Sequence, residues 1–151
     1  LVTWLVPVLV LLTAWDVGMR YLFNAGSVLR QELEWHLFAA IFLLGAAWTL
    51  HRDEHVRVDV LYRSRRLSER ARAWIDLAGS LVFLLPFCVL VIGYAWDFVA
   101  VAWRIGEGSP DPGGLPARWV VKALMPVGFL LLALEGLALA LRSLARLQEG
   151  P

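Results

Sequence analysis

The sequence predicts an all-α membrane protein with four transmembrane helices and a basic amphipathic interfacial helix between the second and the third. Hydrophobic residues make up 60% of the 151-residue chain, and its mean hydropathy is +0.66, whereas soluble domains are about 45–50% apolar. This apolar content is enough for about four helical spans of about 20 residues each. The 8 tryptophans lie near the ends of the apolar runs, as in the aromatic belts of membrane proteins. The composition excludes a soluble domain and a nucleic-acid-binding protein.

The four spans belong to a single integral membrane domain that covers the chain. We expect them at about 1–23, 33–50, 74–103 and 119–141. The first apolar run lacks the basic start and the small-residue cleavage site of a signal peptide, so we interpret it as a membrane helix. Because the chain begins at Leu1 rather than Met, we expect residues ahead of it.

The connection between the second and third spans is rich in arginine. Over about 57–72, apolar residues recur at steps of three and four while arginines occupy another face, which predicts a helix at the level of the lipid headgroups. An ordinary solvated loop is the alternative. The arginines expected to contact lipid phosphates are Arg63, Arg65, Arg66, Arg70 and Arg72.

Basic residues also predict the orientation in the membrane. Most of the 14 Lys and Arg residues lie in the 51–73 connection and in the tail after residue 141. Such an excess belongs on the cytoplasmic side. Both termini are therefore expected in the cytoplasm, and the two remaining connections face outward.

Two polar features inside or beside the spans are candidates for chemistry. His51 and His55, with Glu54 between them, match a zinc-protease pattern in which two histidines four residues apart share a metal. The sequence offers no convincing third ligand. A stand-alone four-helix membrane enzyme or redox protein with a metal at His51 and His55 is therefore only the alternative function. Glu135 lies inside the fourth span, where a carboxylate must face protein or water. It is either a protonated glutamate that is hydrogen-bonded within the helix bundle, or it contacts a partner helix or lines an ion path.

Several classes of site have no counterpart in the sequence. The chain has no P-loop, no dinucleotide-binding glycine turn and no nucleophile elbow. Its single cysteine, Cys88, excludes an intrachain disulfide. We therefore expect neither cofactor nor metal nor catalysis, and interpret the chain as a subunit. A stand-alone small transporter or channel is a further alternative.

The ordered motifs of the chain resemble the small, DctQ-like membrane subunit of tripartite ATP-independent periplasmic (TRAP) transporters. The resemblance covers about Asp16 to Arg142. Its most specific pieces are Gly45-Ala46 and the pair His55 and Asp59. The other pieces are Arg20–Asn24, Gln31–Leu33, Phe42–Ala47, Arg52, Leu115–Trp119 and Pro126–Gly128.

The resemblance implies a scaffold for a large permease subunit in the bacterial inner membrane. In this family a periplasmic binding protein delivers an organic acid, and an ion gradient, usually of sodium, drives uptake. Phospholipids and, through the outer loops, the binding protein are further expected partners. The residues expected to matter for the subunit interface or the structural motif are Arg20, Asn24, Glu32, Gly45, Ala46, Arg52, His55, Asp59, Trp119 and Glu135.

Three expectations concern the surroundings of these residues. Arg20 and Glu32 are expected to pair across the first outer turn. His55 and Asp59, four residues apart, are expected to brace the entry to the interfacial helix. The small residues Gly45 and Ala46 are expected to let another helix approach the second span closely.

Overall fold

The computed structural model describes residues 2–52 and 67–148, and these are helical apart from short connections. The elements, in chain order, are α1 (Val2–Phe23), α2 (Val28–His51), α4 (Glu69–Ala78), the π-helical segment η1 (Gly79–Leu84), α5 (Leu85–Arg104) and α6 (Trp119–Gln148). Four helices are long and apolar enough to cross a membrane, because α4, η1 and α5 form one continuous helix. The predicted fold class of four membrane-spanning helices is confirmed.

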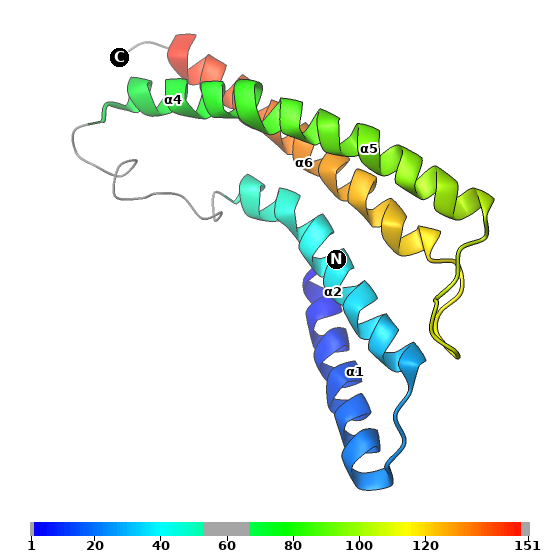
Figure 1. Ribbon diagram of the computed structural model, residues 1–151. Helices are drawn as coiled ribbons and strands as arrows, with labels where there is room; N and C mark the ends of the chain where they lie inside the picture. Colours follow the sequence, from blue (N-terminus) through cyan, green and yellow to red (C-terminus); the bar gives the residue numbers. More distant parts are fainter. Residues whose placement is uncertain (1, 53–66, 149–151) are drawn as a thin grey trace.

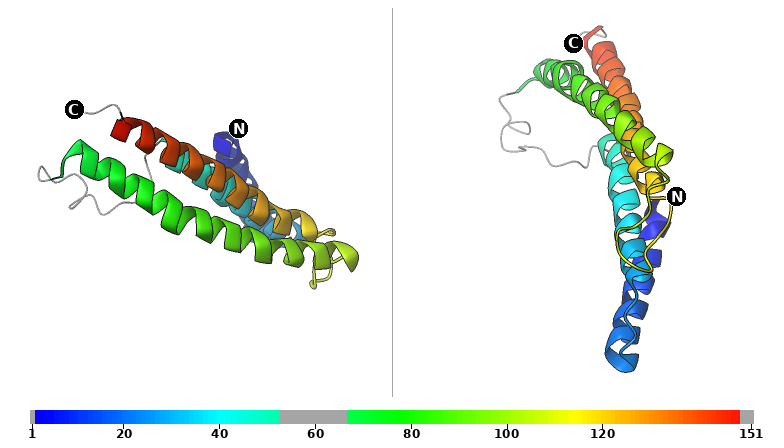
Figure 2. Two further views of the ribbon diagram at one scale, coloured as in Figure 1. Left: turned by 90° about the horizontal axis from the view of Figure 1, so that it is seen from above. Right: turned by 45° about the vertical axis from the view of Figure 1, so that its right-hand side comes forward.

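The helices form an open row rather than a closed four-helix bundle. Helix α6 lies at the centre, with the α4–η1–α5 helix antiparallel on one side and α2 on the other. Helix α1 packs mainly on α2 (Figure 1). Figure 2 shows that the α1–α2 hairpin leaves the α5–α6 pair at a wide angle. Each outer helix therefore presents most of its surface away from the chain.

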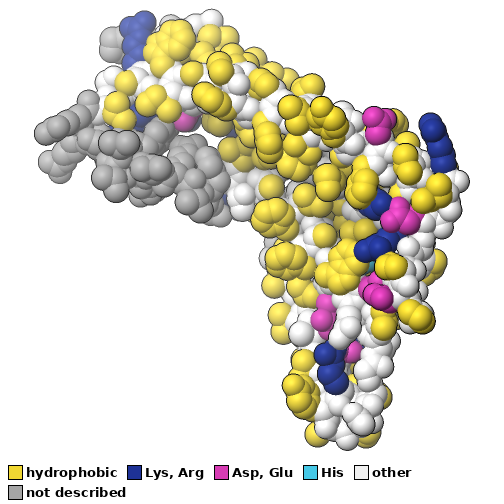
Figure 3. All heavy atoms as spheres, in the orientation of Figure 1, with side chains coloured by type: hydrophobic (Ala, Val, Ile, Leu, Met, Phe, Trp, Pro, Cys, Tyr) yellow, Lys and Arg dark blue, Asp and Glu magenta, His cyan; other side chains and the backbone are white. Residues whose placement is uncertain are grey.

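Burial follows the pattern of a membrane protein, with apolar side chains outside. The largest fully buried side chains in the described part of the chain are small or polar, namely Asp16, Ser80, Cys88 and Ser143. Large apolar residues such as Phe83, Tyr94 and Leu11 are at least 70% exposed, and apolar side chains cover much of the face in Figure 3. Small residues between the helices permit close backbone approach, while lipid solvates the large ones.

Two helices begin before the residues that the sequence indicates. Helix α2 starts at Val28 rather than near 33, after Ser27 in the extended N-cap position, because its early charged residues find partners in neighbouring segments. Helix α4 starts at Glu69, where Ser68 Oγ accepts a hydrogen bond of 3.2 Å from Ala71 N. The described part of the predicted interfacial helix, residues 67–72, thus opens the third span, and 57–66 lie outside the described residues.

Pro86 accounts for the π-helical segment within the third span. Proline has no N–H, and its ring clashes with the carbonyl four residues earlier in a regular α-helix. Here the preceding turn is widened, and Leu85 N donates to Ser80 O, five residues back. The widened turn keeps the helix continuous past the proline.

Helices α2 and α6 approach each other closely at Gly128. A Cβ on Gly128 would lie 2.7 Å from the carbonyl oxygen of Leu43, so α6 meets the backbone of α2 there. A Cβ on Gly45 would meet only Val2 Cγ1, at 3.8 Å. The tight helix packing expected at Gly45 and Ala46 is therefore not seen at Gly45 within residues 2–52 and 67–148.

Candidate functional site

The turn between α1 and α2 is closed by a buried carboxylate. Asp16, on the last turns of α1, is 1% exposed. It accepts hydrogen bonds from Arg20 and, at 2.7 Å to Nε, from Arg30 of α2. Two guanidiniums thus bond the same carboxylate, and this cluster joins the two helices of the hairpin.

Asn24 shapes the turn that this cluster closes. Its φ is 53°, a left-handed value that asparagine tolerates better than most residues. Ala25 N then donates to Met19 O, six residues back, at 3.0 Å, which closes the end of α1. Arg30 also donates to Ala25 O at 2.5 Å. The prediction that Arg20 pairs with Glu32 is wrong, because Asp16 lies one helical turn from Arg20 while Glu32 faces another segment.

Glu32 holds the loop between α5 and α6 against the start of α2. Its side chain is 6% exposed. Ser109 Oγ donates to Oε1, and Leu115 N donates to Oε2 at 2.5 Å. A Cβ on Gly114 would lie 2.7 Å from Glu32 Oε2. Glycine at position 114 therefore lets the loop backbone reach the carboxylate.

The 105–118 loop is also ordered by its own contacts. Ser109 N donates to Leu115 O at 3.0 Å, and Arg118 N donates to Glu107 O at 2.8 Å. Gly106 and Gly113 take positive φ values of 60° and 80°, which glycine adopts without strain. These bonds make the loop a folded cap at one end of the helices.

Charged and aromatic side chains fasten the same loop to the helices. Lys122 of α6 pairs with Glu107 and lies 3.9 Å from the centre of the Phe98 ring. Trp119, a residue singled out from the sequence, packs edge-on against Trp103 at a centroid distance of 4.5 Å. Trp119 therefore joins the first turn of α6 to the last turn of α5.

A second polar cluster joins α2 to α6 at the opposite end of α2. Glu135 Oε1 lies 2.5 Å from Arg142 Nη2 and 3.1 Å from His51 Nδ1. The Glu135 side chain is 17% exposed. Among the described residues Glu135 thus has partners within the helix bundle, one of which is a guanidinium, whereas the first of its two sequence interpretations expects a protonated glutamate.

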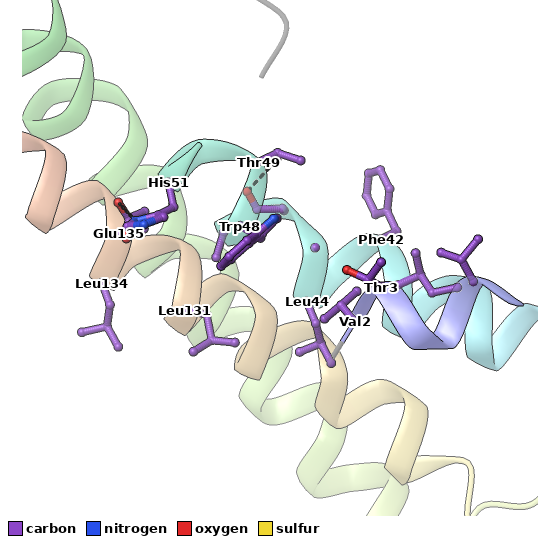
Figure 4. A pocket seen from close by; sticks show the side chains of 15 residues that line it. Val2, Thr3, Phe42, Leu44, Trp48, Thr49, His51, Leu131, Leu134 and Glu135 are labelled. Atoms are coloured by element: carbon purple, nitrogen blue, oxygen red, sulfur yellow. Dashed lines mark hydrogen bonds and ion pairs between the residues drawn. The ribbon is translucent and has the colours of Figure 1, made fainter. Parts of the chain in front are cut away.

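An apolar groove runs from this cluster along α2. It has a volume of about 940 Å³ and is bounded by the start of α1, the second half of α2 and the middle of α6. In Figure 4, Trp48, His51 and Glu135 lie at one end and Val2, Thr3 and Phe42 toward the other. Gly45 and Ala46 belong to its lining.

Some of the remaining candidate residues lie within the described part of the chain and the others lie outside it. Arg52 stacks on Trp48, with 5.0 Å from its guanidinium carbon to the ring centre. Arg70 and Arg72 lie on α4. The others, His55, Asp59, Arg63, Arg65 and Arg66, lie outside the described residues.

The described residues do not form a metal site. No group of three or more His, Cys, Asp or Glu side chains in 2–52 and 67–148 could hold a metal ion. His51, one half of the possible metal pair, instead contacts Glu135. This geometry offers no support for a metalloenzyme.

Sequence reasoning missed several residues that make these clusters. They are Asp16, Arg30, Ser109, Lys122 and Arg142. For Asp16 a signal was present, since a carboxylate inside a span four residues before an arginine favours an i,i+4 pair. Ser109 had no such signal, because its partner is 77 residues away.

The fold and the clusters define a multi-pass membrane protein whose buried polar groups connect helices and loops. Its residues 9–146 match the family model described as "Tripartite ATP-independent periplasmic transporters, DctQ component". The chain therefore belongs to the DctQ family of TRAP transporter components, as its motifs predict. This family consists of transporter subunits and is not an enzyme family.

Named relatives agree with the family. The chain is 31% identical over 91 residues to the sialic acid TRAP transporter small permease protein SiaQ of Vibrio cholerae, a match that covers 60% of this chain and 51% of that protein. It is 28% identical over 147 residues to the C4-dicarboxylate TRAP transporter small permease protein DctQ of Pseudomonas aeruginosa, covering 90% of this chain and 68% of that one. The match thus spans about half the length of SiaQ and about two thirds of DctQ.

Proposed function

We propose that the chain is the small permease subunit of a TRAP transporter and acts as a membrane scaffold for the large permease subunit. The family match over 9–146 is the observation that carries this proposal. The open row of helices is compatible with it, because most of the apolar surface of α1 and α2 faces away from the chain. A scaffold of this kind needs broad apolar faces and interfacial anchors rather than a reaction site.

The substrate class is proposed to be an organic acid. The named relatives serve sialic acid and C4-dicarboxylates, both of which are carboxylic acids. An ion gradient, with sodium as the ion that the resemblance implies, drives uptake. Specificity belongs to the binding protein and the large subunit rather than to this chain.

The two ends of the scaffold are proposed to have different partners. The 105–118 loop, held by Glu32, faces the periplasm and presents exposed residues such as Asp111 to the binding protein. Both termini lie in the cytoplasm, where Arg63, Arg65, Arg66, Arg70 and Arg72 contact phospholipid headgroups. The motif residues His55 and Asp59 brace the connection that carries these arginines.

Reconstitution tests the scaffold role. Proteoliposomes that contain this chain, the large subunit of its transporter and the binding protein are expected to take up the organic acid when an inward sodium gradient is applied. Omitting this chain is expected to abolish uptake. Full uptake by the large subunit and binding protein alone would contradict the proposal.

Cysteine labelling tests the orientation separately. Cys88, the single cysteine, is buried and can be replaced by serine. In that background a membrane-impermeant maleimide is expected to label Asp111→Cys in spheroplasts, and Gln148→Cys only after permeabilisation. The reverse pattern would overturn the orientation but not the family.

A further inference from the structure

We propose that the groove beside α2 binds one phospholipid, with its acyl chains along the groove and an anionic headgroup at the His51 end. The groove is apolar along its length and polar at one end. This inference concerns the chain's own surface and does not depend on which large subunit or substrate the transporter uses.

The length of the groove favours a lipid over a helix of another subunit. Along α2 it extends from Ile41 to His51, which corresponds to about 15 Å at the rise of an α-helix. That is half of the roughly 30 Å hydrocarbon core, and therefore the depth of a single leaflet. A transmembrane helix would be expected to require a groove across both leaflets.

The lining suits acyl chains. The floor contains Gly45, Ala46 and Ala47, and nothing lies closer than 3.8 Å to the place where a Gly45 Cβ would stand. Exposed Phe42, Trp48, Leu131 and Leu134 form the walls. Flexible chains can follow such a surface and bury apolar area on both sides.

The charges at the polar end suit a phosphate. Arg142 and His51 are 44% and 51% exposed while they contact Glu135. Arg52 is exposed and stacks on Trp48, a wall residue. The two guanidiniums of Arg52 and Arg142 outnumber the Glu135 carboxylate in these contacts, which suits an anionic headgroup. The tryptophan and arginines also suit the level of the interface.

Photocrosslinking locates the lipid. The purified full chain is incubated in detergent with phosphatidylglycerol that carries a diazirine in its acyl chain, and adducts are mapped by mass spectrometry. Adducts are expected to concentrate in 41–51 and 131–135. An even spread over all four spans would mean ordinary annular lipid and would overturn the proposal.

Paired variants test the groove itself. Gly45→Leu fills the floor and is expected to reduce these adducts about tenfold or more. Gly93→Leu, at a position on α5 with nothing within 4 Å of its Cβ, is the matched control and is expected to leave them unchanged. Equal adduct yields in both variants would refute the groove.

The headgroup end is tested independently, which keeps the proposal falsifiable if Gly45→Leu misfolds. The double variant Arg52→Gln, Arg142→Gln is expected to remove the preference for phosphatidylglycerol over phosphatidylcholine with the same acyl chain, whereas Arg146→Gln retains it. An unchanged preference in the double variant would overturn the assignment. Loss of the groove adducts in the assembled transporter would also overturn the assignment, because it would mean that another subunit occupies the groove.

Discussion

The backbone N–H of Leu115 donates a hydrogen bond of 2.5 Å to the carboxylate of Glu32, which lies 83 residues earlier in the chain. Ser109 Oγ donates to the other oxygen of the same carboxylate. A single side chain at the start of α2 therefore fixes the loop that connects α5 to α6. Hydrogen bonds to charged groups are stronger than those between neutral groups, so Glu32 has a large influence on the order of this loop.

Glu32→Ala is expected to loosen the 105–118 loop. Both loop hydrogen bonds to the carboxylate are lost, so amide hydrogen exchange at Ser109–Leu115 should accelerate by about tenfold or more. Glu34→Ala is the matched control two residues away, since Glu34 Oε1 has no hydrogen-bond partner among the described residues. Similar exchange in both variants would show that Glu32 does not order the loop.

Asp16→Asn is expected to destabilise the α1–α2 hairpin. Arg20 and Arg30 would then face each other across a neutral side chain, and burying an uncompensated charge is unfavourable. The apparent Tm in detergent should fall by about 5 °C. Asp97→Asn, on the exposed face of α5, should leave Tm within about 1 °C. A Tm of Asp16→Asn equal to that of the wild type would contradict this account.

Gly128→Ala is expected to separate α6 from α2. The added Cβ would lie 2.7 Å from Leu43 O, and backbone atoms cannot move aside as a flexible side chain does. The expected loss in unfolding free energy is about 1–3 kcal/mol. Gly93→Ala should be neutral or slightly stabilising, because alanine is the better helix former and the position is open. Equal stabilities would indicate that the two helices do not meet at Gly128.

The Glu135–Arg142 pair is expected to contribute only modestly to stability. Arg142 is 44% exposed in this pair, and exposed pairs contribute at most about 1 kcal/mol. In a double-mutant cycle, Glu135→Gln and Arg142→Gln should therefore show a small favourable coupling. Transport activity measured on the same variants distinguishes a structural pair from a functional carboxylate. Full activity in Glu135→Gln would exclude an ion path through this residue.

The sequence indicates where some residues lie along the spans, but it does not indicate which side chains they contact. Trp103 follows one long apolar run and Trp119 precedes another, so the sequence indicates that both lie at span ends, and the two rings contact each other there. The motifs indicate that Arg20 and Glu32 matter, but the sequence predicts that these two residues pair with each other. Their true partners, Asp16 and the 105–118 loop, depend on the direction in which each side chain leaves its helix.

The sequence alone determined which segments span a membrane and to which family the chain belongs. Both depend on one-dimensional features, namely the length of apolar runs and the order of short motifs. Only the tertiary structure decided that Gly128, rather than Gly45, lies at the tight contact between α2 and α6, and that Gly45 lines an apolar groove. The rotation and crossing angle of each helix select which face meets a neighbour, and apolar residues all around a helix do not specify that face.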